Sequence, residues 1–245
     1  MMTTGPQIDF EKHNSAQRHY FERSLKRTML PADSPYLRRQ VDELVRFAGI
    51  RNDESLLEVG CGMGRYTLKL AERGLRIEGL DLTPRLLERL REFNAARYDI
   101  PLYCADVMNP PPELNERFDV VLGFFTLHHL HDLKPCFRAM KRLLKPSGRV
   151  VFLEPNPYNP LYYLQVMLTP GMTWEGDRGI VRMRRRVIFD AMQSAGLVHP
   201  ALLRFGFFPP ALANMRRVQT IERRLESFPL WRAALPFQLF RGELP

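Results

Sequence analysis

The sequence predicts an α/β protein with a doubly wound, mostly parallel sheet of seven strands, folded as one domain of 245 residues. Three observations lead to this fold class. Apolar runs of strand length recur along the chain, segments with helical spacing separate them, and no compositional break divides the sequence. Such alternation places consecutive strands parallel through right-handed crossovers. The expected strands lie at residues 56–59, 75–82, 100–105, 118–124, the end of 143–153, 198–208 and 235–241.

Helical segments precede and connect these strands. Two helices are expected ahead of the sheet, at Phe10–Leu30 and Tyr36–Ala48, and crossover helices are expected at 65–72, 84–97 and 133–145. Leu212–Phe228 has apolar residues at helical spacing, which predicts an amphipathic helix packed on the core. The segment after it is expected to be an antiparallel last strand, and the alternative is an interfacial membrane anchor formed by arginines with Trp231, Phe237 and Phe240.

These elements divide the single domain into four parts. Residues 1–50 are expected to form a helical lid, 51–155 the sheet core, 156–196 an insertion over the site, and 197–245 the C-terminal strands and amphipathic helix. From Pro155 to Trp174 the chain carries no charge, but four prolines interrupt this stretch. It therefore predicts a loop and short helix over a pocket rather than a membrane span.

A glycine-rich loop follows the first expected strand. The apolar run 56–59 contains Glu58 and leads into Gly60, Gly62 and Gly64. Glycines at alternate positions let the chain turn sharply while a ligand lies against bare backbone. The dinucleotide fingerprint needs a third glycine three residues after the second, and neither frame of this loop supplies one. The loop therefore predicts a cofactor site of another kind.

Acidic residues end the next two expected strands. Asp81 comes about twenty residues after the loop, where a carboxylate can bind both hydroxyls of a ribose. Asp106 follows the third run, and Phe124 ends the fourth. Because the carboxyl ends of parallel strands meet at one edge of a sheet, these residues are expected to line one site.

The pattern Glu58-x-Gly60-x-Gly62-x-Gly64, with the strand ends that follow it, resembles the class I S-adenosylmethionine-dependent methyltransferases. The resemblance covers Leu56 to about Pro155 and implies their Rossmann-like sheet. One departure is Ser147, where the turn before the fifth strand more often has a second glycine.

The resemblance also implies a role for each matching residue. Glu58 would orient the first turn near the methionine half of the cofactor, and Asp106 would accept a hydrogen bond from the adenine amino group beside the backbone of Val107. The end of the fourth strand would contact the methionine amino group. The residues expected to bind the cofactor are Glu58, Gly60, Cys61, Gly62, Gly64, Asp81, Leu82, Asp106, Val107, Phe124 and, from the N-terminal helix, Tyr20.

Three residues are candidates for a general base that would help if the acceptor is a hydroxyl or a protonated amine. His128 and His129 follow the fourth strand, and Glu154 ends the fifth. Related methyltransferases commonly have one or two histidines at this place, often with a structural role, so both readings stay open. The histidines lack a partner group at metal-ligand spacing, and no metal site is predicted.

The insertion supplies residues for the acceptor. An aromatic and amide lining is expected there, formed with Asn156 and Asn159 by the candidate substrate residues Tyr158, Tyr162, Tyr163, Trp174 and Glu175. Asn156-Pro157-Tyr158 is similar to the box with which nucleic-acid amino methyltransferases hold a base. In those enzymes the box directly follows the fourth strand, whereas here it comes one strand later. A small or lipid-like acceptor is therefore expected, and nucleic acid is not.

The net charge of +9 is concentrated near the C-terminus. Residues 176–245 hold twelve arginines and no lysine against five acidic residues, an excess of seven positive charges. Such a region is expected to be a solvated face or to contact an anionic membrane. Asp9, Glu11 and Lys12 replace the apolar stretch of a secretory signal, and the three cysteines lack metal spacing. A cytoplasmic protein, peripheral at most to a membrane, is expected.

Other functions remain to be distinguished. An RNA methyltransferase would be retained on RNA in a salt-sensitive way. A non-catalytic S-adenosylmethionine-binding scaffold would show no turnover, and an oxidoreductase would bind a nicotinamide cofactor. The acceptor atom and the oligomeric state do not follow from the sequence.

Overall fold

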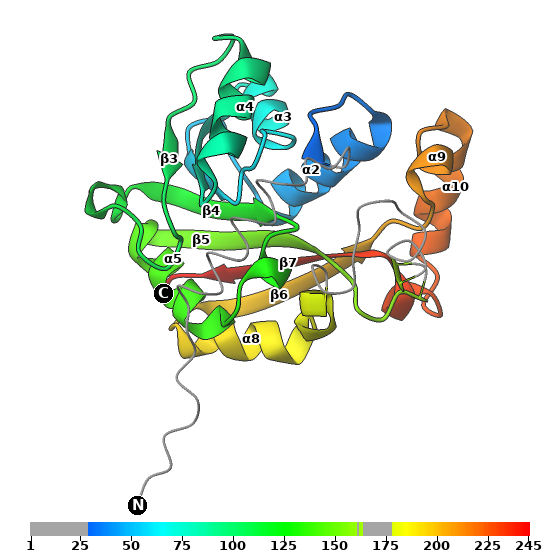
Figure 1. Cartoon of the computed structure of the whole chain (residues 1–245). Coiled ribbons are helices and arrows are strands. Elements are labelled where there is room, and N and C mark those ends of the chain that lie inside the picture. Colours follow the sequence, from blue (N-terminus) through cyan, green and yellow to red (C-terminus); the bar gives the residue numbers. More distant parts are fainter. Residues whose placement is uncertain (1–28, 161, 164–177) are drawn as a thin grey trace, which may run out of the picture.

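The structure is a computed structural model that describes residues 29–160, 162–163 and 178–245. Its seven-stranded sheet has the order β3-β2-β1-β4-β5-β7-β6 (Figure 1). Neighbouring strands are parallel from β3 to β5, whereas β7 is antiparallel to both β5 and β6. The predicted doubly wound sheet with an antiparallel last strand is confirmed. The strands are β1 (Ser55–Val59), β2 (Arg76–Asp81), β3 (Leu102–Cys104), β4 (Phe118–Phe124), β5 (Leu144–Pro155), β6 (Val198–Phe205) and β7 (Phe237–Glu243).

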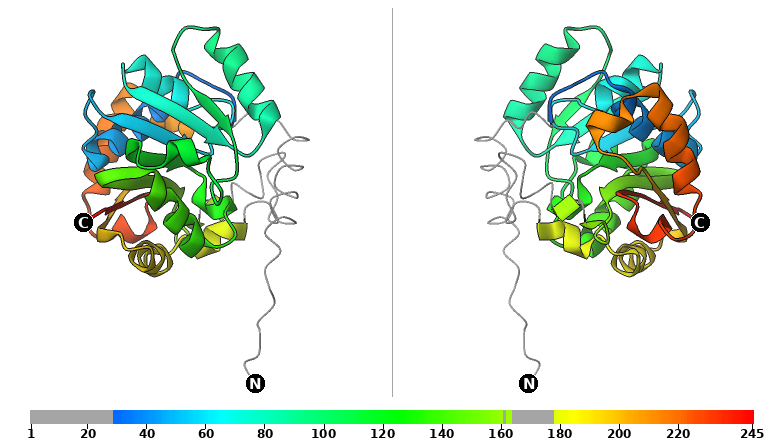
Figure 2. Two further views of the ribbon diagram at one scale, coloured as in Figure 1. Left: turned by 90° about the vertical axis from the view of Figure 1, so that its left-hand side faces the viewer. Right: turned by 90° about the vertical axis from the view of Figure 1, so that its right-hand side faces the viewer.

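Helices cover both faces of the sheet, as Figures 1 and 2 show. On one side lie α2, α3 and α4, and on the other lie α5 and α8. The described α-helices are α2 (Pro35–Ala48), α3 (Thr67–Glu72), α4 (Pro84–Asn94), α5 (Leu133–Leu143), α8 (Arg185–Ser194), α9 (Pro210–Ala213) and α10 (Arg216–Glu226). Short 3-10 turns are η2 (Pro112–Leu114), η3 (Leu127–His129), η4 (Arg178–Arg182) and η5 (Arg232–Ala234).

Helix α2 shows how local sequence sets these elements. Ser34 caps its start, because the Ser34 hydroxyl accepts a hydrogen bond from the Leu37 amide at 3.2 Å. Gly49 ends it in the left-handed conformation, with φ of 63°. Buried side chains recur three or four residues apart and face the sheet. The predicted helix Tyr36–Ala48 is therefore confirmed to within one residue.

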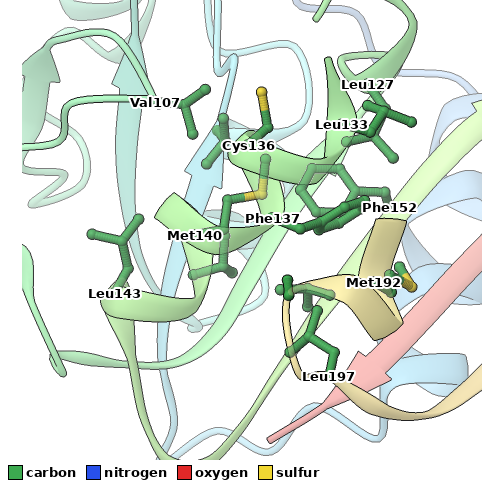
Figure 3. Close-up of a cluster of buried hydrophobic side chains, with 14 of the residues drawn as sticks. Val107, Leu127, Leu133, Cys136, Phe137, Met140, Leu143, Phe152, Met192 and Leu197 are labelled. Atoms are coloured by element: carbon green, nitrogen blue, oxygen red, sulfur yellow. The ribbon is translucent and has the colours of Figure 1, made fainter. Parts of the chain in front are cut away.

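The larger core cluster lies between the sheet and the helices α5 and α8. Phe137 and Met140 of α5 pack toward Phe152 of β5 and Met192 of α8 (Figure 3). The rings of Phe137 and Phe152 meet edge to face, with centroids 6.0 Å apart. Fully burying one such side chain contributes about 1.5 to 3 kcal/mol. These contacts keep β4 and β5 in fixed positions, and both strands end at the candidate site.

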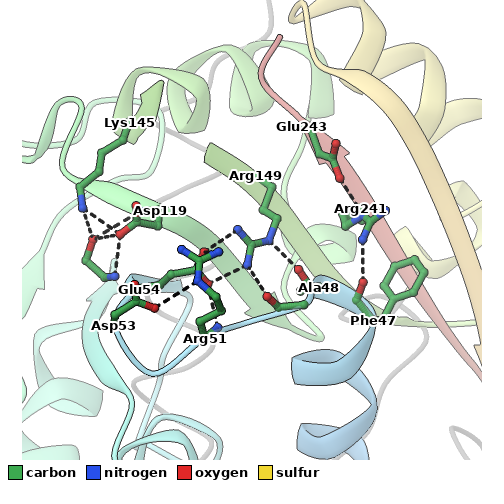
Figure 4. Close-up of polar contacts among 12 residues, drawn as sticks. Phe47, Ala48, Arg51, Asp53, Glu54, Asp119, Lys145, Arg149, Arg241 and Glu243 are labelled. Carbon is green, nitrogen blue, oxygen red and sulfur yellow. Dashed lines mark hydrogen bonds and ion pairs between the residues drawn. The ribbon is translucent and has the colours of Figure 1, made fainter. Parts of the chain in front are cut away.

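Ion pairs join the strand ends at the opposite edge of the sheet (Figure 4). Arg149 bonds to Glu54 at 2.8 Å, and Lys145 bonds to Asp119 at 2.8 Å. Burial alone would raise the pKa of Asp119, but hydrogen bonds from Lys145 and Ser55 lower it to about 2. Charged groups at this edge therefore serve stability, since the strands begin here and ligands bind at their other ends.

Two local predictions need correction. β5 begins at Leu144, where a helix and turn were expected, and the register against β4 shifts between Phe118 and Val120. Ser147 lies in this irregular part with φ of 61°, which explains why glycine suits the position. The strand predicted to run to Phe208 ends at Phe205, since Gly206 turns the chain with φ of 83°.

The prediction of one continuous helix over Leu212–Phe228 with its apolar face in the core is wrong on both points. The segment is divided into α9 and α10, and the Asn214 side chain between them accepts a hydrogen bond from the Tyr36 amide at 3.0 Å. Ile221 and Phe228, expected in the core, are 52% and 58% exposed, whereas Glu222 is 2% exposed. Among the described helices, none combines the length and the apolar character that crossing a bilayer requires.

Candidate active site

The carboxyl edge of the sheet gathers most of the predicted site residues. Glu58 lies one residue before the end of β1, Asp81 ends β2, and Phe124 ends β4. Glu154 lies one residue before the end of β5. Parallel pairing of β2 with β1, β1 with β4 and β4 with β5 brings these strand ends side by side.

The glycine loop is built around one open position. Gly60, Gly62 and Gly64 all have positive φ, at 72°, 51° and 83°. A β-carbon at Gly60 would lie 2.7 Å from the Thr126 side chain, and one at Gly64 would lie 2.7 Å from Leu90. A β-carbon at Gly62 would meet nothing within 4 Å. Two of the glycines thus allow close packing of the protein, and Gly62 offers bare backbone to open space.

Asp81 fixes this loop from the end of β2. One carboxylate oxygen accepts the Gly62 amide at 2.8 Å, and the other accepts the Thr83 amide at 2.8 Å. Burial raises the pKa of Asp81, and the backbone hydrogen bonds act in the opposite direction. The Thr83 hydroxyl and the Leu82 amide also hydrogen-bond to this carboxylate. Its position at the end of β2, beside an open glycine, fits a nucleoside with two ribose hydroxyls.

Glu58 is enclosed behind the loop and is 1% exposed. Its carboxyl accepts a hydrogen bond at 2.6 Å from the Thr67 hydroxyl, at the start of α3. Burial and the charge of Asp81 raise the pKa of Glu58, the Thr67 hydrogen bond lowers it, and the net pKa is about 8. The residue therefore joins β1 to the first turn of α3.

The raised pKa of Glu58 predicts a pH-dependent stability. Between its ordinary pKa of 4.5 and about 8 the folded protein keeps a proton that the unfolded chain has lost, so stability falls as pH rises through this range. Urea unfolding measures this. From pH 5 to pH 8.5 the free energy of unfolding of wild type should fall by about 2 to 4 kcal/mol more than that of Glu58→Gln. Parallel pH curves for the two proteins would contradict this assignment.

The other predicted cofactor residues lie around the loop in different ways. The Asp106 carboxylate accepts the Met108 amide at 2.9 Å and so holds the turn after β3, where Val107 is buried. Leu82, directly after Asp81, is half-buried. Cys61 points into the protein, packed with Leu87 and Leu90, so only its backbone is available to a ligand.

Phe124 is 4% exposed and stacks on Tyr66, with ring centroids 4.0 Å apart. Its side chain therefore belongs to the core, and a ligand can meet only its backbone. Phe125 follows with φ of 55°, a conformation that bulky residues rarely adopt, and its ring contacts Phe237. Sequence reasoning missed Tyr66 and Phe125, because no local pattern marks either ring or the left-handed backbone.

Glu154 and His128 form a buried pair. One Glu154 oxygen accepts the amides of Thr126 and Leu127 at 2.8 and 2.7 Å, and the other lies 2.7 Å from Nδ1 of His128. Glu154 is 0% and His128 4% exposed. The His129 ring lies beside that of His128, with centroids 4.0 Å apart. In the part of the chain that the structure describes, no group of acidic residues, cysteines and histidines is arranged to hold a metal.

The turn held by Glu154 also supports the glycine loop. The Thr126 hydroxyl donates to the carbonyl oxygens of Val59 or Phe124, at 3.1 and 3.2 Å, and its side chain occupies the space beside Gly60. A chain of direct contacts thus runs from Glu154 through Thr126 to Gly60. Sequence reasoning named the two ends but missed Thr126, which carries no motif of its own.

The predicted acceptor lining is only partly described. Tyr158 is 54% exposed, Tyr162 and Tyr163 are half-buried, and the Tyr163 hydroxyl donates to the Pro157 carbonyl at 2.8 Å. Tyr20, Trp174 and Glu175 lie outside the described residues.

The two asparagines expected in this lining are instead structural. Asn156 and Asn159 are 0% and 5% exposed, and their amides donate to the carbonyl oxygens of residues 233–235. They fasten the loop after β5 to the segment before β7. Their hydrogen bonds are used within the protein, so the prediction that they line the acceptor site is wrong.

Comparisons with known proteins agree with this geometry. The family model described as "Methyltransferase domain" matches residues 57–152, which span β1 to β5. The ubiquinone biosynthesis O-methyltransferase of Pseudomonas entomophila is 27% identical over 169 residues, covering 68% of this chain and 70% of the relative. That of Pseudomonas paraeruginosa is 29% identical over 166 residues, covering 66% and 68%.

Solved structures with the same fold are more distant in sequence. Geranyl diphosphate C-methyltransferase from Streptomyces coelicolor matches with a TM-score of 0.63 at 16% identity, over 99% of this chain and 100% of the other. Phosphoethanolamine N-methyltransferase 2 of Haemonchus contortus, solved with S-adenosyl-L-methionine, matches with a TM-score of 0.62 at 18% identity, over 84% of this chain. The match spans about half of that protein, 52%.

The family match, the relatives and the fold agree with the open glycine loop and the strand-end carboxylates. Residues 57–152 match a methyltransferase domain, and together with the relatives and the fold this match supports a class I S-adenosylmethionine-dependent methyltransferase.

Proposed function

We propose that the protein transfers the methyl group of S-adenosylmethionine to a small-molecule or lipid-like acceptor by in-line displacement at the carboxyl edge of the sheet. The observation that carries this proposal is the open face of Gly62 beside the buried Asp81 carboxylate. Incubation with methyl-labelled cofactor and a panel of phenols, amines and prenyl lipids tests it. Transfer of label to an acceptor is expected, and transfer to RNA alone would contradict it.

The residues present fit the cofactor. S-adenosylmethionine supplies, when bound, a methyl group on a sulfonium sulfur that is already activated for displacement. Asp81 would hold the ribose hydroxyls, Asp106 and Val107 the adenine, and the backbone of Phe124 the methionine amino group. Gly60, Gly62 and Gly64, with Cys61 and Leu82, would give backbone contacts. The protein then has mainly to position the acceptor, which can contribute about 7 to 11 kcal/mol.

His128 is the base that the geometry favours, with Glu154 as its positioning residue. A carboxylate oxygen accepts hydrogen bonds, so the short contact implies that Nδ1 of His128 carries a proton. In the neutral ring this leaves Nε2 as the acceptor of a proton, the arrangement by which a carboxylate orients a catalytic histidine. His129, half-buried beside it, is the second candidate.

His128→Asn separates a base from a structural histidine. The Asn amide can replace Nδ1 as donor to Glu154, so the fold should keep its stability while the titratable Nε2 is lost. Turnover with a hydroxyl acceptor should fall by about 10²- to 10⁴-fold, with cofactor affinity unchanged. His129→Gln is the matched variant. If His128→Asn keeps wild-type turnover and His129→Gln loses turnover, the general base is His129 and not His128.

For the acceptor we propose the space beneath residues 1–50 and 156–196, which would act as a lid and an insertion over the sheet core of 51–155. Tyr158, Tyr162 and Tyr163 support this, because they lie directly after β5 on the same edge as the glycine loop. Tyr20, Trp174 and Glu175 would complete the enclosure. A phenolic or prenylated acceptor suits such an aromatic lining, and the relatives are named as O-methyltransferases of ubiquinone biosynthesis.

We also propose a cytoplasmic enzyme that makes peripheral contact with an anionic membrane through its basic C-terminal region. The excess of seven positive charges in residues 176–245 supports this location. Cell fractionation at low and high salt tests it, and a protein that stays in the membrane fraction only at low salt is the expected outcome. A protein in the soluble fraction at both salts would contradict it.

A further inference from the structure

The chain between β6 and β7, residues 206–236, lies at the same edge of the sheet as the candidate active site. Phe205 at the end of β6 pairs with Phe237 at the start of β7, and Phe237 pairs with Pro155 at the end of β5. Figures 1 and 2 show α9 and α10 standing at this end of the sheet, apart from its helix-covered faces. This segment, called here the β6–β7 connection, therefore borders the rim where the acceptor would enter.

Both acidic side chains of the connection point inward. Glu222 accepts the amides of Phe207 and Phe208 at 2.8 and 2.9 Å and is paired with Arg39 of α2. Glu226 accepts the Gly206 amide at 2.6 Å and bonds to the same arginine. Their negative charges are thus used in fastening α10 to the protein.

The opposite face of α10 combines arginine with exposed apolar side chains. Arg217, Ile221, Arg224 and Phe228 recur at intervals of three or four residues, which places them on one face, and all four are exposed. Ile221 is 52% and Phe228 58% exposed, whereas a helix face that contacts only water is expected to carry polar side chains. The outward face of the helix therefore carries positive charge and apolar surface, without an acidic residue.

The loop after α10 extends this surface. Leu230 is 78% and Trp231 47% exposed, and Arg232 beside them is exposed as well. Large apolar side chains in a short loop flanked by arginines are the composition of an interfacial membrane anchor. Exposure of several such residues together in one segment marks an interaction surface rather than ordinary surface composition.

We propose that the β6–β7 connection docks on an anionic lipid bilayer, with Phe228, Leu230 and Trp231 among the headgroups and Arg217 and Arg224 of α10 against lipid phosphates. Charge complementarity favours this occupant: the connection holds five arginines, and its two acidic residues face inward. The expected anchor residues Phe237 and Phe240 are not part of it, since both are buried in β7 at 8% and 0% exposure.

Docking at this place would mean that the acceptor reaches the site from the membrane. Asn156 and Asn159 tie the loop after β5 to residues 233–235, so the connection and the segment with Tyr158 are held together. A bilayer in contact with Trp231 would then lie next to the acceptor rim. This consequence rests on the proposed function: the acceptor is a compound dissolved in the membrane, and docking lowers its apparent KM without changing kcat for a water-soluble analogue.

Sedimentation with phosphatidylcholine vesicles, with and without phosphatidylglycerol, tests the docking. Wild type should bind the anionic vesicles, and the Arg217→Ser, Arg224→Ser double variant should lower the partition coefficient by roughly 10- to 30-fold. The Leu230→Ser, Trp231→Ser double variant should bind at least tenfold less, and this loss should persist at high salt. The matched control changes Arg91 and Phe93 to Ser, an exposed arginine and a 44% exposed phenylalanine near the end of α4.

The outcomes separate docking from catalysis. S-adenosylmethionine binding and thermal unfolding of every variant should match wild type. Vesicle binding without methyl transfer would overturn the proposed methyl transfer and leave the docking. Methyl transfer without vesicle binding would overturn the docking and the peripheral membrane contact and leave the proposed reaction. Equal loss in the α4 control, a dimer that dissociates on changing Leu230 and Trp231, or retention on RNA with no binding to vesicles would each overturn the proposal.

Discussion

Gly62→Ala is expected to keep the wild-type fold, at a cost of about 1 to 2 kcal/mol in backbone strain, and to bind S-adenosylmethionine roughly 10- to 100-fold more weakly, a loss of about 1 to 3 kcal/mol in binding. The added methyl group meets no protein atom within 4 Å, so it does not disturb the packing of the loop. It projects into the space where a cofactor would lie against bare backbone. Calorimetric titration and thermal unfolding measure the two effects separately.

Gly74→Ala is the matched control. Gly74, at the end of α3, has φ of 75°, and a β-carbon there also meets nothing within 4 Å. Both substitutions add about 1 to 2 kcal/mol of backbone strain. Only Gly62 belongs to the predicted cofactor loop. An equal loss of cofactor affinity in the two variants would show that strain, and not contact with a ligand, is responsible.

Glu154→Ala is expected to lower the free energy of unfolding by about 3 to 5 kcal/mol, the largest loss predicted for one residue. The substitution leaves the buried amides of Thr126 and Leu127 and the Nδ1 of His128 without their acceptor. Each buried group left unsatisfied costs about 1 to 3 kcal/mol. Because Thr126 packs against Gly60, cofactor affinity should fall as well. Urea unfolding and titration measure both.

Glu154→Gln distinguishes positioning from stability. Its single carbonyl oxygen can still accept both amides, as one Glu154 oxygen does, so stability should remain close to that of wild type. Its NH₂ group donates to Nδ1 of His128 and so selects the tautomer with the proton on Nε2. Turnover should therefore fall by about 10²- to 10⁴-fold. Wild-type turnover in Glu154→Gln would leave Glu154 a purely structural role.

Glu78→Ala, which removes a half-buried carboxylate, serves as the control for Glu154→Ala. Glu78 is 16% exposed and bonds to the flexible side chains of Arg117 and Tyr103. Its partners can turn to water, so a loss below about 1 kcal/mol is expected. A loss equal to that of Glu154→Ala would mean that burial of backbone donors is not what makes Glu154 important.

Sequence patterns predicted the sheet well because they are local. A parallel strand that is buried on both faces reads as a continuous apolar run, as at Leu56 and Leu57, and glycines or acids mark where it ends. The order of glycine loop, Asp81 and Asp106 along the chain then predicted one site at one edge. Parallel pairing of β1 to β4 and to β2, and of β2 to β3, explains why these residues lie at one edge of the sheet.

Contacts between distant segments could not be predicted in this way. The apolar spacing of Leu212–Phe228 predicted a buried apolar face. Arg39, more than 180 residues away in sequence, pairs with Glu222 and Glu226, so α10 buries its acidic face instead. Asn156 appeared free to bind an acceptor because its partners lie near residue 235. Thr126 carries no motif, and its importance follows only from its position against Gly60.

The central claim is that the carboxyl edge binds S-adenosylmethionine through the glycine loop and Asp81. Calorimetric titration of wild type and Asp81→Ala with S-adenosylmethionine and its demethylated product tests it most directly. A single site of micromolar affinity in wild type, lost in an Asp81→Ala protein that still unfolds cooperatively, is the predicted result. Absence of heat with folded wild type, or unchanged affinity in Asp81→Ala, would contradict it.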